Sequence, residues 1–359
     1  MRDNSVSISK GIGIFLMVLA HTQFSDYGNT WINMFHMPLF FFVSGYCFKE
    51  KYIHDFKTFA VKRIKGCWWP YVKYSLLFTI CHNLFYKLHF YDMNWGGYKT
   101  PYSMSEMLNH CLMVLKFSQA EQLLGGYWFL KTLFYASFIS FVCIYLATYI
   151  ETQFPKAKFK RTIGVCIGLS VVSSFLFSLF DLHIPIFGIA VRELIATCFI
   201  LMGYLYRNHI SHLIRYSNIS YITLFLSAIS LTTIGSLFWK MSMTDIVTLH
   251  IVPYLLSSVI MSILILETIK LFYKESKVSK LFKFMGDNSI EILTWHFLSF
   301  KLANYLIVSL YNLPVGQMAE FPTISEYSKH GFWILYLISG ITIPLLIRRT
   351  ILSLKRCNK

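Results

Sequence analysis

Ten stretches of about 20 mostly apolar residues recur along the chain, and they limit its fold more than any other feature. A helix of that length crosses the roughly 30 Å hydrocarbon core of a bilayer, and it satisfies its own backbone hydrogen bonds where water is absent. The sequence therefore predicts an all-α integral membrane protein, a bundle of about ten transmembrane helices. The predicted spans cover residues 6–24, 31–48, 68–90, 127–150, 162–180, 186–206, 217–238, 246–266, 289–311 and 331–351.

The composition agrees with a membrane protein. The 359 residues are 55% hydrophobic and only 14% charged, whereas about a quarter of the residues in a soluble domain are charged. The first apolar stretch carries Lys10 and lacks the order of regions found in a signal peptide, so we expect it to remain as a helix. No internal repeat or separate soluble segment is visible, and residues 1–359 are predicted to form one polytopic domain.

The basic residues indicate how the spans are oriented. Of the 33 Lys and Arg, 24 lie near the two termini and in the loops on the same side, while five lie in the opposite loops. This asymmetry follows the positive-inside rule and predicts that both termini are cytoplasmic, in a multi-pass protein of the plasma or inner membrane. The formal net charge of +16 is thereby explained without a nucleic-acid partner.

The eight cysteines indicate neither a disulfide framework nor a metal site. Cys111 alone falls in an expected outer loop, and no CxxC pair occurs. The longest outer connection, about 91–126, is rich in aromatic and turn-forming residues, and a connection of that length is more often functional than idle. No bound metal and no permanent cofactor are predicted.

Two histidines lie at comparable depth in neighbouring spans. His21 follows Lys10 by eleven residues, which is roughly 16 Å along a helix, and His36 lies about 7 Å inside the second span. The short turn between the spans makes the two helices neighbours. Pro38 cannot donate to the carbonyl group of Met34, so we expect a free acceptor and a kink beside His36.

Each histidine alone could be a packing residue that bonds to a backbone carbonyl. Two histidines at matched depth beside a proline favour a site, because ionisable residues within a membrane are costly and usually functional. We therefore predict His21 and His36 as catalytic residues.

Basic residues also gather after the second span. The stretch "KRIKGCWWPY" places Lys62, Arg63 and Lys65 at the cytoplasmic interface. The positive-inside rule with an aromatic belt accounts for such residues, and so does a binding site for the phosphates of a cytosolic donor, to which arginine makes forked contacts.

Polar residues in later spans give further candidates for substrate binding or support. Trp128 at the outer interface, with Lys131 one turn later, fits a belt tryptophan and a lysine that extends to the membrane surface. Arg192 and Glu193 lie about seven residues inside a span, where charge is usually functional. For His296, about 10 Å deep, packing and catalysis are equally compatible with its position.

Six stretches together resemble one family of membrane enzymes. In chain order they read "KGIGIFLMVLAH", "FHMPLFFFVSGY", "KRIKGCWWPY", "YWFLKTLF", "FILMGYLY" and "GDNSIEILTWH", and they extend from about residue 10 to residue 296. The first two are the specific ones. The chain resembles the acyltransferase-3 family of integral-membrane O-acyltransferases, most of all its fucose 4-O-acetylase-like branch.

The resemblance implies a fold of about ten helices and transfer of an acyl group, usually acetyl from acetyl-CoA, to hydroxyls of surface or exported glycans. The family's basic residue, followed after ten positions by a histidine, corresponds to Lys10 and His21. The family also has two arginines ahead of a proline. This chain has the first, Arg63, but Gly66 stands at the position of the second.

The resemblance also implies roles for these residues. His21 is the expected general base for the acceptor hydroxyl, and His36 orients it or stabilises the oxyanion. The expected donor-binding residues are Lys10, Lys62, Arg63 and Lys65. The expected partners are acyl-CoA as cosubstrate, a glycan or lipid-linked sugar as acceptor, and membrane lipids, with a homo-oligomer left open.

Two other classes of protein stay open. A polysaccharide or glycolipid exporter or flippase of the same membrane family is the main alternative, since ten helices with charges at the midplane also suit a transporter. No pair of Gly/Pro-broken spans occurs in corresponding halves, which counts against it. A membrane scaffold or receptor without chemistry is disfavoured by the two histidines.

Overall fold

The computed structural model describes residues 4–92, 100–118, 121–154, 159–212 and 217–357, and these form helices and no named strand. The longer helices are α1 (Asn4–His21), α8 (Trp128–Gln153), α9 (Phe159–Leu179), α10 (Val191–Leu205), α11 (Asn218–Ile234), α12 (Ile251–Phe272), α14 (Ser289–Tyr311) and α16 (Trp333–Cys357). The shorter ones are α2 (Asp26–Asn33), α3 (His36–Tyr46), α4 (Phe56–Arg63), α5 (Trp69–Ile80), α6 (His82–Lys87), α7 (Met104–Val114), α13 (Lys277–Asp287) and α15 (Ser325–Tyr327).

Short 3-10 or π segments connect or extend these helices. They are Glu50–Ile53, Ile64–Trp68, Gln122–Tyr127, Tyr206–Ile210, Gly235–Trp239, Thr248–His250, Val315–Ala319 and Ser328–Phe332. The all-α prediction is confirmed for the described residues.

Within the described ranges, six helical segments are long and apolar enough to cross a membrane. They are Asn4–His21, Gln122–Gln153, Arg161–Leu179, Asn218–Trp239, Thr248–Phe272 and Ser325–Thr350. Each of the six overlaps one of the stretches predicted as a span. The protein is therefore a multi-pass membrane protein.

The other four predicted stretches contain helices that are broken, short or more polar. α2 and α3 divide one stretch between them, and α5 and α6 divide another. α10 has only 15 residues, and α14 is long enough but carries Glu291, His296 and Lys301.

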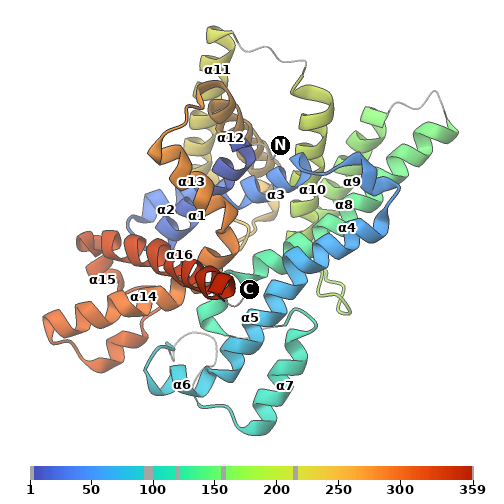
Figure 1. Ribbon diagram of the computed structural model, residues 1–359. Coiled ribbons are helices and arrows are strands. Elements are labelled where there is room, and N and C mark those ends of the chain that lie inside the picture. The colour runs from blue at the N-terminus through green and yellow to red at the C-terminus, as the bar shows by residue number, and fades with distance from the viewer. Residues whose placement is uncertain (1–3, 93–99, 119–120, 155–158, 213–216, 358–359) are drawn as a thin grey trace.

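The helices that end and begin at the two predicted catalytic histidines lie near the centre of the molecule. Figure 1 shows α1 and α3 there, with α14 and α16 on one side and α8, α9 and α10 on the other. α1 packs directly against α3, and α3 packs against α10. The predicted connection 91–126 contains a further helix, α7, in its described part.

Glycines let α1 and α13 touch backbone to backbone. A Cβ atom on Gly11 of α1 would lie 1.9 Å from the carbonyl oxygen of Phe282 in α13. In the same contact, a Cβ on Gly286 would lie 1.8 Å from the carbonyl oxygen of Ser7. Small residues permit this close approach between helices in membranes.

α3 meets α10 in the same way. A Cβ on Gly45 would lie 1.8 Å from the carbonyl oxygen of Ile200, and one on Gly203 would lie 2.0 Å from that of Phe42. Because His36 is the first residue of α3, this contact fixes the helix that carries it.

The second predicted span is broken beside His36. α2 ends at Asn33 and α3 begins at His36, so two residues lie between the helices. The carbonyl oxygen of Met34, which Pro38 leaves without its helical donor, accepts a hydrogen bond of 2.5 Å from the Ser258 hydroxyl of α12. The expected kink is present, and the acceptor that was expected to be free has a partner on another helix.

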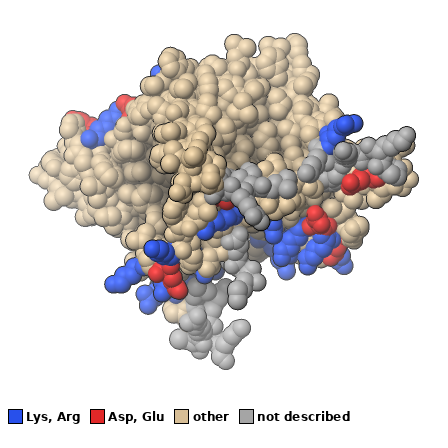
Figure 2. All heavy atoms as spheres, turned by 90° about the horizontal axis from the view of Figure 1, so that it is seen from above, with Lys and Arg blue, Asp and Glu red and all other residues tan. Residues whose placement is uncertain are grey.

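The surface is largely apolar. Figure 2 shows a broad face without Lys, Arg, Asp or Glu, and charged side chains gathered mostly along one edge. Large side chains such as Leu169 of α9, Leu226 of α11 and Leu302 of α14 are 62%, 57% and 50% exposed. Soluble proteins rarely expose broad apolar patches, so contact with lipid explains this surface.

The α3–α10 contact can be tested with Gly45→Ala. The added methyl group would overlap the Ile200 carbonyl, and overpacking of this kind costs about 1–3 kcal/mol in the free energy of unfolding. We expect a lower midpoint of thermal unfolding in detergent. Gly164→Ala in α9 is the matched control, because no heavy atom lies within 4 Å of its added Cβ. Equal midpoints for the two variants would contradict the contact.

Candidate functional site

The end of α1 and the start of α3 meet at a small cavity. His21 and His36 both line it, and its volume is about 60 Å³; we call it the histidine cavity. They are the ionisable side chains among the described residues that line this space. The structure thus brings the two histidines together, while their catalytic roles stay a prediction.

The ring of His36 is oriented by the backbone of α2. Its Nδ1 lies 2.9 Å from the carbonyl oxygen of Ile32. A carbonyl oxygen only accepts, so Nδ1 carries the proton in this hydrogen bond, and Nε2 has the lone pair in the neutral ring. His36 can therefore accept a hydrogen bond or a proton through Nε2.

His296 lies behind His21 and does not line the cavity. The two rings are stacked, with centroids 5.4 Å apart and planes 27° apart. Nδ1 of His296 lies 3.1 Å and 3.0 Å from the carbonyl oxygens of Ile292 and Leu293, and its buried Nε2 has no partner among the described residues. This geometry makes His296 a support for the ring of His21.

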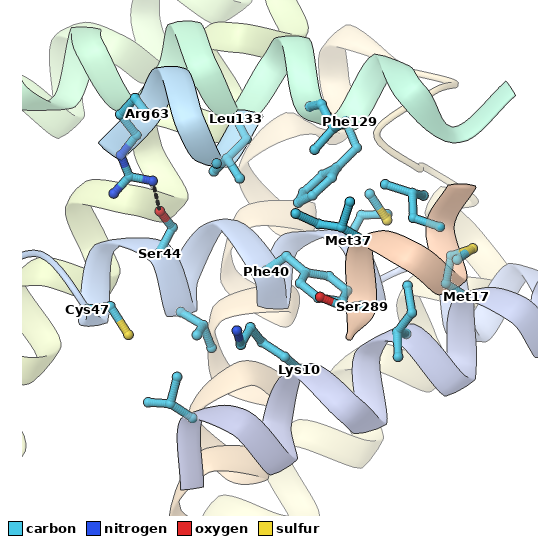
Figure 3. A pocket seen from close by; sticks show the side chains of 17 residues that line it. Lys10, Met17, Met37, Phe40, Ser44, Cys47, Arg63, Phe129, Leu133 and Ser289 are labelled. Carbon is cyan, nitrogen blue, oxygen red and sulfur yellow. Dashed lines mark hydrogen bonds between the residues drawn. The ribbon is translucent and has the colours of Figure 1, made fainter. Parts of the chain in front are cut away.

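A second pocket, of about 270 Å³, lies beside α1, α3 and α8. Figure 3 shows Arg63 above and Lys10 below, with Ser44 between them and with Phe40 and Phe129 farther to the right. These two basic residues are the charged ones among the described residues that line the pocket, which we call the Lys10 pocket. Nη1 of Arg63 donates a hydrogen bond of 3.3 Å to the Ser44 hydroxyl.

The other predicted donor-binding residues lie outside this pocket. Lys62 is exposed and donates a hydrogen bond of 2.7 Å to the Tyr52 hydroxyl, and Lys65 is exposed to solvent. Gly66 does line the pocket, and no heavy atom lies within 4 Å of where its Cβ would be. The structure therefore separates Arg63 from the two neighbouring lysines.

A third pocket, of about 450 Å³, contains the remaining candidates. We call it the Arg192 pocket; Trp128, Lys131, Arg192 and Glu193 line it. The guanidinium group of Arg192 lies 4.7 Å from the ring centroid of Trp128, and its Nε donates a hydrogen bond of 2.7 Å to the carbonyl of Met243. Trp128 and Lys131 therefore face a pocket, although a belt at the membrane surface would also have accounted for them.

The histidine cavity lies between the two pockets. Met17, Met37 and Leu293 line both it and the Lys10 pocket. Trp128 and Thr244 line both it and the Arg192 pocket. The three spaces therefore form a row in which each pocket shares wall residues with the histidine cavity.

Some residues of this row carry no signal in the sequence. Asn33 lines the histidine cavity from the last position of α2, and its side-chain amide supplies a hydrogen-bond donor beside His36. Thr244 lies in a connection between helices and lines two of the three spaces. The position of Asn33 three residues before His36 is the one available hint, because it places both residues beside the same helix break.

A buried lysine holds the loop that packs behind the histidines. Lys301 of α14 is 1% exposed, and its ammonium group donates three hydrogen bonds to that loop. Phe321 of the loop packs on Phe297 at a centroid distance of 4.7 Å, and Phe297 lies 4.8 Å from the ring of His21. The three acceptors are the carbonyls of Met318, Ala319 and Glu320, at 3.2, 3.0 and 2.8 Å.

The arrangement can support transfer of a group between two bound molecules. A histidine in the central cavity can remove a proton from a hydroxyl group. The two cations of the Lys10 pocket suit a phosphorylated molecule, and its apolar wall suits an extended chain.

Comparisons with known proteins agree with this chemistry. A family model described as an acyltransferase domain, that of the acyltransferase-3 family, matches residues 3–349. Searches of curated proteins and of solved structures found no match. The matched range contains every residue that lines the three spaces, and the predicted family is confirmed, although no branch within it is singled out. The chain belongs to the acyltransferase-3 family and is a membrane acyltransferase.

Proposed function

We propose that the protein is an O-acetyltransferase that moves an acetyl group from cytosolic acetyl-CoA to a hydroxyl of a cell-surface or exported glycan. The donor is a cosubstrate, and no permanently bound cofactor takes part. A fucose 4-O-acetylase-like enzyme of the plasma or inner membrane fits this description.

The row of three spaces is the observation that carries the proposal. The CoA phosphates would bind Lys10 and Arg63, and the pantetheine arm would follow the apolar wall of the Lys10 pocket toward His21. Lys10 and His21 are eleven residues apart on α1, or roughly 16 Å. The acceptor would reach the same histidine from the Arg192 pocket.

Each step of the reaction has a residue beside it. His21 removes the proton of the acceptor hydroxyl as the oxygen attacks the thioester carbonyl; a new ester bond forms, the carbon–sulfur bond breaks, and the proton passes to the CoA thiolate. His36 accepts a hydrogen bond through Nε2 and orients His21 or the hydroxyl. The amide of Asn33 is a candidate donor to the oxyanion.

The size of the histidine cavity favours a short acyl group. It is the smallest of the three spaces, at about 60 Å³ against about 270 Å³ and about 450 Å³ for the two pockets. A longer chain would need the flexible side chains of Met17 and Met37, which line the wall toward the donor, to move aside.

The proposed orientation has ten spans and cytoplasmic termini, as the distribution of Lys and Arg indicates. Lys10 lies in the first half of α1, which puts the Lys10 pocket toward the cytosol, where CoA is found. Arg192 lies at the start of α10, after a connection on the opposite side. Donor and acceptor would then arrive from opposite sides of the membrane.

Cysteine labelling tests this orientation. A single cysteine placed in the loop 49–67 or 267–288 should react with a membrane-impermeant maleimide only after the membrane is opened. One placed at 100–118 should react in intact cells. Reaction of the 100–118 position only from the cytosol would overturn the orientation, and with it the assignment of donor and acceptor sides.

The donor site is tested by a set of alanine variants. Lys10→Ala and Arg63→Ala should each raise the KM for acetyl-CoA about tenfold or more, because a hydrogen bond to a charged group is worth about 1.5–3 kcal/mol. Lys65→Ala, which removes an exposed lysine just outside the pocket, is the matched control and should leave this KM unchanged. If the KM for acetyl-CoA in all three variants equals that of the unaltered protein, these basic residues do not bind the donor. Their role is then only to orient the protein in the membrane.

The catalytic assignment is tested by transfer of labelled acetyl from acetyl-CoA to a glycan. His21→Ala should reduce the rate about a hundredfold to ten-thousandfold, the usual loss when a general base is removed. His36→Ala should also be severe, whereas His36→Gln should retain part of the activity through its hydrogen bonds. The double alanine variant should be little worse than His21→Ala, because residues that act together are not additive.

His330→Ala, which removes an exposed histidine far along the chain, is the control for this series. Normal transfer by both alanine variants at equal protein level would show that the histidines are packing residues. Glycan-dependent binding without any transfer by the unaltered protein would point instead to an exporter or flippase.

A further inference from the structure

The Arg192 pocket is the largest of the three spaces in the row. In the proposed function the donor occupies the Lys10 pocket, which leaves the Arg192 pocket for the acceptor. The charged groups among its described lining residues are Lys131, Arg192 and Glu193. Their hydrogen bonds decide which donors and acceptors remain for a ligand.

The carboxylate of Glu193 is already engaged by the protein. One oxygen accepts a hydrogen bond of 2.7 Å from the Thr132 hydroxyl, and the other accepts one of 2.9 Å from the backbone N–H of Ala190. The side chain is buried, at 3% exposure. Glu193 therefore closes the first turn of α10 with both of its oxygens, and two cations and one anion face the pocket among its described lining residues.

The two cations have spare donors. Lys131 forms no hydrogen bond or ion pair with any described residue. Arg192 uses its Nε on the carbonyl of Met243, and no described residue bonds to its terminal Nη groups. Nη groups make paired hydrogen bonds to a carboxylate or a phosphate.

The backbone opposite Lys131 makes room for its ammonium group. Gly188 has a φ of +58°, a conformation that favours glycine, and a Cβ at this position would lie 2.7 Å from Nζ of Lys131. The lysine is thus placed over a residue without a side chain, inside the pocket. This placement differs from that of a lysine that extends along the lipid to the membrane surface.

Trp128 connects these cations to the histidines. Its ring lies against the guanidinium group of Arg192 and also lines the histidine cavity. Trp128 is therefore a wall residue common to the Arg192 pocket and to the space that His21 lines.

We propose that the acceptor is anionic: Lys131 and Arg192 bind a carboxylate or phosphate group of the glycan, and this contact places a neighbouring hydroxyl at His21. This inference rests on the proposed function, since it names the class of acceptor for the same reaction. A uronic acid would supply the carboxylate, and a phosphorylated sugar or a lipid-linked sugar phosphate would supply the phosphate.

The test uses the full-length protein in lipid nanodiscs with labelled acetyl-CoA. The acceptors are matched oligosaccharides that are neutral, carry one uronic acid, or carry one phosphate monoester. We expect kcat/KM to be higher for the uronic-acid acceptors or for the phosphate acceptors than for the neutral ones. The charged set that is preferred identifies the anionic group, carboxylate or phosphate, that the pocket binds. Lys131→Met should lower kcat/KM for that set about tenfold to a hundredfold, through the KM of the acceptor.

Three comparisons make the result specific. Lys131→Met should leave the KM for acetyl-CoA unchanged and should lower kcat/KM far less for neutral acceptors than for the charged set, and Lys131→Arg should retain the preference. Lys240→Met, at an exposed lysine outside the three spaces, should behave as the unaltered protein. Equal transfer to neutral and charged acceptors, unaffected by Lys131→Met, would overturn the inference and leave the proposed function standing.

A binding measurement separates failure of the inference from failure of the proposed function. Binding of the same oligosaccharides to the nanodiscs is measured without acetyl-CoA. Charge-dependent binding that Lys131→Met abolishes, in a protein that transfers acetyl to none of them, would support the anion site and contradict the enzyme. Absence of charge-dependent binding would overturn the anion site.

Discussion

The contact between the backbones of α3 and α10 is the interaction on which the site depends most. Gly45 and Gly203 remove the side chains that would keep these helices apart. α3 begins with His36, and α10 begins beside Arg192, so one helix contact fixes the histidine cavity relative to the Arg192 pocket. In a bilayer, where apolar burial does not drive helices together, close packing of this kind supplies the specificity.

The bilayer also requires that polar groups inside the bundle have hydrogen-bond partners. An unpaired backbone group in hydrocarbon costs several kcal/mol, and Pro38, which has no N–H, leaves such a group at Met34. Ser258 bonds to it from α12, so the irregular backbone that presents His36 is tied to a third helix. The helix break at which His36 lies is thus stabilised by a hydroxyl group 224 residues further along the chain than Met34.

The positions of most long helices could be predicted from the sequence, because segments that contact lipid must be apolar. Apolar stretches located the helices, and the spacing of Lys10 and His21 placed both on α1. Spacing along one helix says nothing about contacts between distant segments. The separation of Arg63 from Lys65 follows from their spacing of two residues, which places them on different faces of a helix. The approach of Trp128 to Arg192 depends on how α8 and α10 cross, and only coordinates show it.

The lysine at the centre of α14 also changes what the following loop tolerates. A connection between two helices normally accepts an inserted tag or a shortened segment, because its backbone bonds mainly to water. Here the carbonyls of 318–320 bond to Lys301, whose ammonium group is buried among them. Segment 315–324 is therefore a poor place for an epitope or a fluorescent reporter, although it connects two helices. Tagging is better directed to the segment around Lys274, whose side chains are exposed at the protein surface.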